Sequence, residues 1–195
     1  MYAQRNRVSL VDLRIVDLLE RTRTPATVFV NGLFAKAYPA LIQRLARDPW
    51  IELANHSWDH AGWTPSCPAM IPISAPMTRR LEVTMTAQIV ARLTGIHLTY
   101  FRFPAFCGTS ADVAFVHALG ETVIGSTCFF GDSRHWSAAL QVASVERGCG
   151  WGSIVVAHLN GPPYGPNTHE ALATLIPWWR AHSWRVVTVG TLLRT

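Results

Sequence analysis

Short apolar runs alternate with longer amphipathic segments along most of this chain. Runs of four or five apolar residues between polar or Gly/Pro turns are typical of strands buried on both faces of a parallel sheet. The pattern predicts strands at residues 26–30, 51–54, 98–101, 121–124, 154–157 and 185–189. Strands that alternate with helices predict an α/β fold with a parallel sheet, either doubly wound or closed as a barrel.

Apolar residues at helical spacing predict the helices between these strands. The first helix is expected over residues 9–21, with Ser9 as its N-cap, and another is expected to stop at Gly95. The remaining predicted helices cover residues 34–47, 78–93, 110–119, 137–147 and 169–182. In either form of α/β fold, functional side chains belong at the carboxyl ends of the strands.

Composition narrows the class of protein. The chain has 195 residues, with 49% hydrophobic and 15% charged, which suits one folded domain over residues 1–195. No apolar stretch is long enough for a membrane span, and residues 1–8 show no signal peptide. The formal net charge is +5, but the arginines are scattered, so the sequence predicts no nucleic-acid partner.

Four cysteines are present and none forms a Cys-x-x-Cys pair, which argues against a structural zinc knuckle. Cys67 and Cys107 both fall in predicted loops and would pair in an oxidising compartment. The alternative is that both are unpaired small apolar residues.

Two histidines follow the strand at residues 51–54 directly. His56 and His60 have three residues between them, a spacing at which two imidazoles bind one metal ion from a tight turn. Ser57 stands where the zincin motif needs Glu, so that motif is excluded. Two surface histidines close by chance are the alternative.

Three further polar residues lie after predicted strands. Arg102 precedes Phe103 and Pro104 and suits bidentate binding of a carboxylate or phosphate. His158 leaves an apolar strand for a Gly/Pro loop, as expected of a general acid, although a hydrogen-bonded core histidine fits as well. Asp132 is placed either to orient a catalytic histidine or to cap the next helix.

Together, in this order, these motifs resemble the NodB-type polysaccharide deacetylase family (carbohydrate esterase family 4) from about residue 11 to residue 193. The resemblance implies a distorted (β/α) barrel that hydrolyses N-acetyl or O-acetyl groups. The usual substrates are N-acetylglucosamine polymers such as chitin or peptidoglycan, or xylan. It also implies a divalent metal ion, usually zinc, and secretion or attachment to the cell envelope in most members.

The resemblance also assigns roles to residues. His56 and His60 would be metal ligands, Arg102 would fix the catalytic base, and His158 would be the general acid. Asp132 would tune that acid, because His135 stands where many members have Asp. Substrate contacts are expected from Trp58, Phe103, Pro104, Trp136 and Asn160.

One motif of the family is expected to be missing. A Thr-Phe-Asp-Asp-Gly sequence at the end of the first strand supplies the base and the third metal ligand. The helix at residues 9–21 is the one that should follow it, so we expect that the chain starts too late to include that strand. The strands at residues 26–30 and 185–189 would then have unpaired edges.

Two other functions stay open at this point. One is a catalytically inactive relative that binds carbohydrate, with Trp58, Trp63 and Trp136 stacking on sugar rings. The other is a family member that acts on a small cyclic amide or imide, with the loops at residues 63–76 and 161–166 narrowing a groove to a pocket. The acetylated substrate, the oligomeric state and the compartment are not decided by the sequence.

Overall fold

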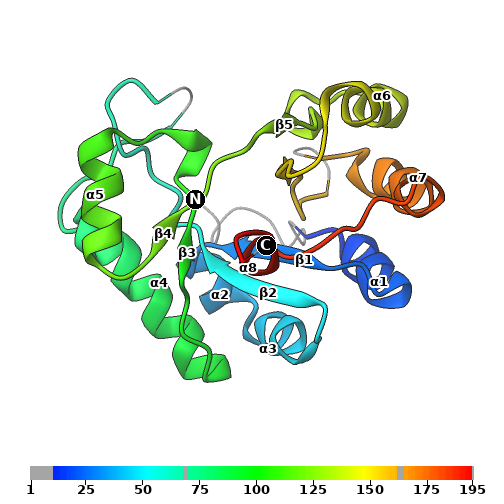
Figure 1. Cartoon of the computed structure of the whole chain (residues 1–195). Helices are drawn as coiled ribbons and strands as arrows, with labels where there is room; N and C mark the ends of the chain where they lie inside the picture. The colour runs from blue at the N-terminus through cyan, green and yellow to red at the C-terminus, as the bar shows by residue number, and fades with distance from the viewer. Residues whose placement is uncertain (1–10, 68–69, 162–164, 195) are drawn as a thin grey trace. The chain divides into compact units, whose positions relative to one another are not determined.

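A computed structural model describes residues 11–67, 70–161 and 165–194, and they alternate between helices and short parallel strands (Figure 1). This confirms the α/β prediction. By their contacts, the described residues divide into two compact units, one of residues 27–125 and the other of residues 11–26 and 126–194. Within the described residues, no helix is long and apolar enough to cross a membrane.

The first unit is built on a four-stranded sheet in the order β1 (Ala26–Val30), β2 (Ile51–Asn55), β3 (Tyr100–Phe101) and β4 (Thr122–Val123). β2, β3 and β4 are paired in parallel, with Asn55 opposite Phe101 and Phe101 opposite Val123. Their carboxyl ends therefore meet at one edge of the sheet. The strand predictions for this half of the chain are confirmed, although β3 and β4 are shorter than expected.

The helices of this unit begin and end where local chemistry requires. The predicted helix at residues 34–47 is two helices, α2 (Gly32–Ala37) and α3 (Pro39–Arg47), because Pro39 lacks an N–H and starts a new helix. α4 (Arg79–Thr94) is capped by the Thr78 side chain and ends at Gly95, whose φ of 76° suits glycine. α5 (Ser110–Ala118) begins with a capping box.

An aromatic core fills the first unit. Trp63, Val83, Phe101, Phe103 and Val116 form one buried cluster. Trp63 contacts Phe101 and Phe103 edge to face, with ring centroids 5.5 and 4.9 Å apart. Trp63 is 2% exposed, so the expectation that it stacks on sugar rings is wrong.

A disulfide between Cys67 and Cys107 joins two loops of the first unit. One loop follows the His56 to His60 segment along the chain, and the other follows Arg102. The pairing anticipated for an oxidising compartment is therefore present.

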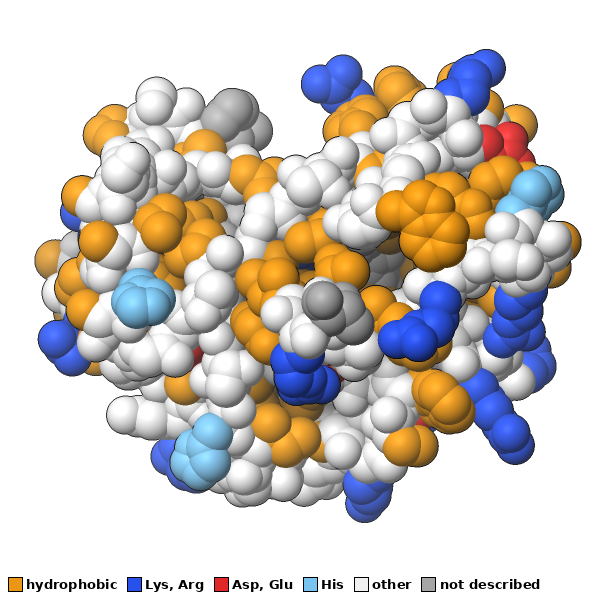
Figure 2. Space-filling model, viewed as in Figure 1, with side chains coloured by type: hydrophobic (Ala, Val, Ile, Leu, Met, Phe, Trp, Pro, Cys, Tyr) orange, Lys and Arg blue, Asp and Glu red, His pale blue; other side chains and the backbone are white. Residues whose placement is uncertain are grey.

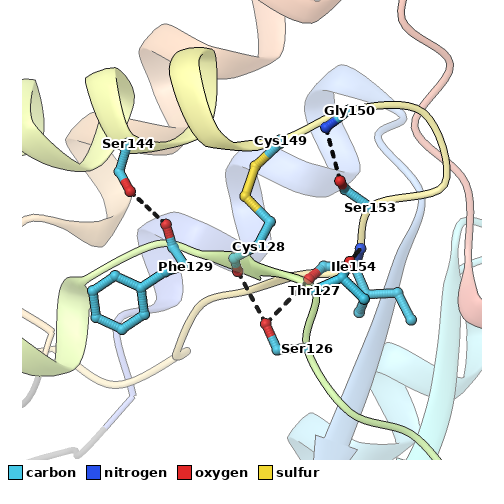
Figure 3. Close-up of a disulfide and its surroundings, with 9 residues drawn as sticks. All are labelled: Ser126, Thr127, Cys128, Phe129, Ser144, Cys149, Gly150, Ser153 and Ile154. Carbon is cyan, nitrogen blue, oxygen red and sulfur yellow. Dashed lines mark hydrogen bonds between the residues drawn. A yellow bond between two sulfur atoms is a disulfide. The ribbon is translucent and has the colours of Figure 1, made fainter.

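The second unit contains a two-stranded parallel sheet of β5 (Cys128–Phe129) and β6 (Val155–Val156), with Cys128 opposite Val155. α1 (Leu13–Thr22) and α6 (Ala138–Gly148) both pack against α7 (Thr168–Ala181). β5 was not predicted, because its apolar run is too short to stand out. A disulfide from Cys128 to Cys149 joins β5 to the end of α6 (Figure 3).

Two predictions in this unit are wrong. Ser9 lies outside the described residues, and the N-cap of α1 (Leu13–Thr22) is Asp12 instead: the Asp12 carboxylate accepts from the Arg14 backbone N–H at 3.1 Å. The backbone before Asp12 is occupied instead in an antiparallel bridge between Val11 and Asn160.

Residues 185–189 do not form the predicted strand. Within the described part of the chain, residues 185–188 are in no ladder, and α8 (Val189–Leu192) starts at Val189 with Thr188 as its cap. β-branched residues favour a strand only where a neighbouring strand supplies the pairing.

Candidate active site

His56 and His60 lie together at the carboxyl end of β2, as their spacing predicted. Their ring centroids are 4.9 Å apart at an angle of 74°. The His56 Nδ1 lies 2.8 Å from the Arg102 carbonyl oxygen. Because a carbonyl only accepts, Nδ1 carries the proton, and Nε2 is the nitrogen suited to bind a metal ion.

The backbone of this segment is unusual. Ser57 and His60 have φ values of 68° and 65°, in the left-handed region that non-glycine residues seldom adopt. Such residues persist where the surrounding structure fixes them. Here the Asn55 side chain accepts from the Ser57 N–H at 3.0 Å.

The carboxylate of Glu82, on α4, accepts hydrogen bonds from the same segment. Its Oε2 accepts from the Ser57 hydroxyl at 2.5 Å and from the Trp58 and Asp59 N–H groups at 2.8 and 3.4 Å. Glu82 is fully buried, and burial raises its pKa. The sequence analysis missed this residue, although a carboxylate on the buried face of an amphipathic helix was a signal.

A second buried carboxyl group lies next to this segment. Glu121 accepts from the Asn55 side chain at 2.9 Å, and Asn55 also donates to the Val83 carbonyl at 3.0 Å. Burial raises the pKa of Glu121 to about 7, and the hydrogen bond from Asn55 only partly opposes that shift.

Arg102 follows β3 directly and is buried. Its Nε and Nη2 donate to the Ile124 and Gly125 carbonyls at 3.3 and 3.0 Å, and its guanidinium lies 3.9 Å from the centre of the Phe29 ring. Burial lowers the pKa of Arg102 to about 10, so the group stays charged at neutral pH. Among the described residues, no carboxylate forms an ion pair with it.

In the second unit, Asp132 and His158 follow the parallel strands β5 and β6 and are in direct contact. The His158 Nδ1 lies 3.1 Å from each Asp132 carboxylate oxygen, and the backbone N–H of His158 donates to Oδ2 at 2.6 Å. A carboxylate only accepts, so Nδ1 carries the proton that Asp132 holds, and Nε2 is the nitrogen at which the ring can exchange a further proton. The His158 side chain is 43% exposed, whereas that of Asp132 is 2% exposed.

Further donors fix Asp132 in place. The Ser133 N–H and the Thr168 hydroxyl donate to it at 2.8 and 3.1 Å. Burial by itself would raise the pKa of Asp132, but the hydrogen bonds and charge of His158 outweigh it, and the pKa is lowered. Asp132 is therefore an anion at neutral pH. Thr168 is a second residue that the sequence analysis missed.

The residues expected to contact substrate differ in their surroundings. Trp58 and Trp136 are half-buried and lie over Gly32 and Gly131, where a Cβ atom would be 2.0 and 2.3 Å from the indole rings. Asn160 is half-buried and pairs with Val11.

Phe103 and Pro104 are buried instead. Phe103 is 5% exposed and packs against Trp63 and Phe101. The structure therefore gives the Phe103 side chain a packing role in place of the expected substrate contact.

The donor set fits part of a metal site. His56 and His60 offer two imidazoles, one of them already fixed through Nδ1, which suits zinc. In the described part of the chain, no group of three or more His, Cys, Asp or Glu side chains is placed to hold a metal ion. The described residues thus supply two of the expected ligands.

The chain resembles solved structures of carbohydrate esterases of family 4 along almost its whole length. It matches the pseudoenzyme BA3943 from Bacillus anthracis with a TM-score of 0.77 and 21% identity, over 92% of this chain and 59% of that one. It matches the Bc1960 peptidoglycan N-acetylglucosamine deacetylase with a TM-score of 0.80 and 20% identity, over 93% of this chain and 81% of that one.

A third match is a family 4 acetyl xylan esterase from Clostridium thermocellum in complex with a cobalt ion. The TM-score is 0.78 and the identity 24%, over 93% of this chain and 82% of that one. These likenesses confirm the deacetylase type of α/β fold.

A curated relative from Geobacillus stearothermophilus, an uncharacterised 30.6 kDa protein, is 27% identical over 83% of this chain. This chain spans 59% of that relative's length. The family model for polysaccharide deacetylase matches residues 9–124, more than half of the chain. The chain therefore belongs to the polysaccharide deacetylase family.

Proposed function

We propose that this protein is a metal-dependent hydrolase that removes acetyl groups from the amino or hydroxyl groups of a polysaccharide. The observation that carries the proposal is the contact between His158 and Asp132, which fixes the imidazole through Nδ1. The structural relatives that act on peptidoglycan and on xylan support a polymer substrate of N-acetylglucosamine or xylose units.

His158 is the general acid in this proposal. With Nδ1 bound to the Asp132 carboxylate, a protonated His158 carries its transferable proton on Nε2 and gives it to the departing amine or hydroxyl oxygen. Asp132 keeps the ring in that tautomer and stabilises its positive charge before transfer. Thr168 and Ser133 keep the carboxylate oriented.

His56 and His60 are the metal ligands, His56 through Nε2. A divalent ion, which we propose to be zinc, polarises the acetyl carbonyl and a water molecule when it is bound. Glu82 and Asn55 hold the backbone that presents both imidazoles.

Arg102 is a positioning residue. A buried guanidinium whose described hydrogen bonds go to carbonyl oxygens has the charge to bind a carboxylate as well. We assign it to the carboxylate that takes the proton from water. The described residues do not identify that carboxylate.

Residues 1–195 act as one domain in this proposal. The structural matches extend over 92–93% of the chain and so include residues of both compact units, which supports the assignment.

A second function has an observation in its favour. This function is that of an inactive relative that binds carbohydrate, because one structural neighbour is a pseudoenzyme of the same esterase family.

The test measures acetate release from N-acetylated chito-oligosaccharides and from acetylated xylan, with zinc or cobalt added, together with bound metal. His158→Ala is expected to lower the rate about a hundredfold to ten-thousandfold and to leave bound metal unchanged. His56→Ala and His60→Ala are expected to lower both. His117→Ala, on an exposed face of α5, is the control and should change neither.

Acetate release that depends on His158 and on metal supports the hydrolase. Metal bound through His56 and His60 without acetate release from either substrate would replace the hydrolase with the inactive relative.

A further inference from the structure

Three tryptophans and a histidine gather on the surface of the second unit. Trp151 and Trp184 are nearly parallel, at 10° and 6.1 Å between ring centroids, and Trp178 lies 6.0 Å from Trp184. His182 stacks on Trp178 at 4.2 Å. We call these four residues the aromatic platform. Trp151 is 84% exposed, the highest value among the exposed large hydrophobic side chains described, so a large indole surface faces water.

The platform lies away from the catalytic candidates of its own unit. Trp151 precedes β6 and His158 follows it, so these residues are at opposite ends of one strand. Trp184 follows the carboxyl end of α7. The platform therefore does not belong to the Asp132 and His158 site.

The backbone segments that carry the platform are held by hydrogen bonds and a disulfide. Trp151 is in a turn that is closed by the Gly150 N–H to the Ser153 hydroxyl at 2.8 Å and by the Ser153 N–H to the Gly150 carbonyl at 3.1 Å (Figure 3). The disulfide from Cys149 to Cys128 anchors the start of that turn.

Trp178, His182 and Trp184 are also held. The backbone N–H of Trp184 donates to the Trp179 carbonyl at 2.8 Å, and the His182 ring Nδ1 lies 2.9 Å from the Trp178 carbonyl oxygen. Tryptophan side chains have only two rotatable bonds, so ordering them on a held backbone costs little conformational entropy when a ligand binds.

Arginines outnumber acidic residues in the part of the chain that carries the platform. Residues 146–195, which contain the whole platform, include four arginines and two acidic residues, Glu146 and Glu170. Arg147, Arg180 and Arg185 of this stretch are exposed. In the space-filling view, blue cationic side chains are spread over the visible face of the molecule, and a red acidic group is visible at the upper right (Figure 2). The exposed arginines of the platform's own segments are thus suited to pair with a negatively charged ligand.

We propose that the aromatic platform is a second carbohydrate-binding site, and that its ligand is a glycan carrying carboxylate groups, such as peptidoglycan. Indole faces pack against the C–H faces of sugar rings, while arginines pair with carboxylates. This inference rests on the proposed function for the class of ligand. The site holds the polymer by a surface other than the one that carries His158.

The test measures binding of the protein to insoluble peptidoglycan sacculi and to neutral chitin, at low and high salt. Trp151→Ala and Trp184→Phe are the variants, and Trp50→Ala, an exposed tryptophan outside the platform, is the matched control. Trp151→Ala should weaken binding to sacculi about tenfold, as loss of an anchoring tryptophan does in other interfaces. Trp50→Ala should bind like the unmodified chain, and circular dichroism checks that each variant folds.

Four outcomes overturn the proposal. The first is that both platform variants bind sacculi as well as the unmodified chain does, and the second is that chitin is bound as tightly as sacculi and independently of salt. The third is that Trp50→Ala loses as much binding as Trp151→Ala. The fourth is that light scattering shows a changed oligomeric state in Trp151→Ala. The last result would make the platform a contact between copies of the chain. The two proposals fail separately. If the unmodified chain binds sacculi but releases no acetate, only the hydrolase is removed. His158→Ala should release less acetate and still bind sacculi like the unmodified chain.

Discussion

The Ser57 hydroxyl donates to the Glu82 carboxylate at 2.5 Å, and both residues are fully buried. The same carboxylate oxygen accepts from the Trp58 and Asp59 N–H groups. One side chain of α4 thus fixes three consecutive residues between His56 and His60. Removing it leaves the buried Ser57 hydroxyl and two partly buried backbone N–H groups without this acceptor.

Glu82→Ala is therefore expected to weaken metal binding by about tenfold to a hundredfold, the usual effect of losing a residue that orients metal ligands. Isothermal titration with zinc measures this loss, and thermal unfolding should show lower stability. Glu146→Gln on an exposed face of α6 is the control. An unchanged zinc affinity in a folded Glu82→Ala protein would mean that the backbone holds the histidines without Glu82.

Asp132→Asn tests the orientation of His158. An amide can donate to Nδ1, so the variant is expected to favour the wrong tautomer and to lower the turnover rate about a hundredfold or more, with zinc affinity unchanged. Ser133→Ala, an exposed neighbour whose backbone N–H contacts Asp132, should keep its rate. A rate in Asp132→Asn within twofold of the unmodified chain would remove Asp132 from the mechanism.

The same variant has a pH signature. The pKa of Asp132 is lowered from 3.8, so the stability that its charged carboxylate contributes is present above that pH and is lost as the pH falls through the lower folded value. The stability difference between the unmodified chain and Asp132→Asn should therefore shrink as the pH falls below about 4. Urea unfolding at a series of pH values measures it.

Much of the fold was readable from the sequence because buried parallel strands are short apolar runs. β1 and β2 stand out for that reason, whereas β5 has too few residues to be recognised. Residues 185–188 show the opposite case, since their β-branched residues are not in a ladder. Pairing depends on neighbours that a local pattern does not contain.

The candidate site was predictable to a different degree. His56 and His60 follow from their spacing at a strand end, and the contact of Asp132 with His158 matches the family resemblance. Glu82 and Thr168 were missed because each acts across a long sequence separation. The burial of Phe103 likewise depends on Trp63, which is distant along the chain.

The disulfide between Cys67 and Cys107 closes a loop with a sequence separation of 40 residues. Replacing both cysteines with serine is expected to lower the free energy of unfolding by about 3–4 kcal/mol, because the unfolded chain regains the entropy of that loop. Urea unfolding measures the change. Reductant should destabilise the double variant less than the unmodified chain, and an equal effect on both would show that the pair contributes nothing.

Glu121 gives the sharpest dependence of stability on pH. Its pKa is raised by burial from 4.5 to about 7 in the folded protein. A raised carboxyl pKa means that the folded state prefers the protonated form, so this contribution is complete below pH 4.5 and is lost as the pH rises to about 7. The loss at and above pH 7 is of the order of 3 kcal/mol.

The glutamine side chain of Glu121→Gln is neutral at every pH and still accepts a hydrogen bond from Asn55. The variant should therefore not lose this stability as the pH rises. We expect the variant to gain stability relative to the unmodified chain as the pH rises from 4.5 to about 7, with no further gain above. Urea unfolding at pH 4.5, 6 and 7.5 measures the difference, and Glu146→Gln controls for removal of one negative charge. A difference that does not change with pH would mean that Glu121 is ionised in the folded protein as in the unfolded chain.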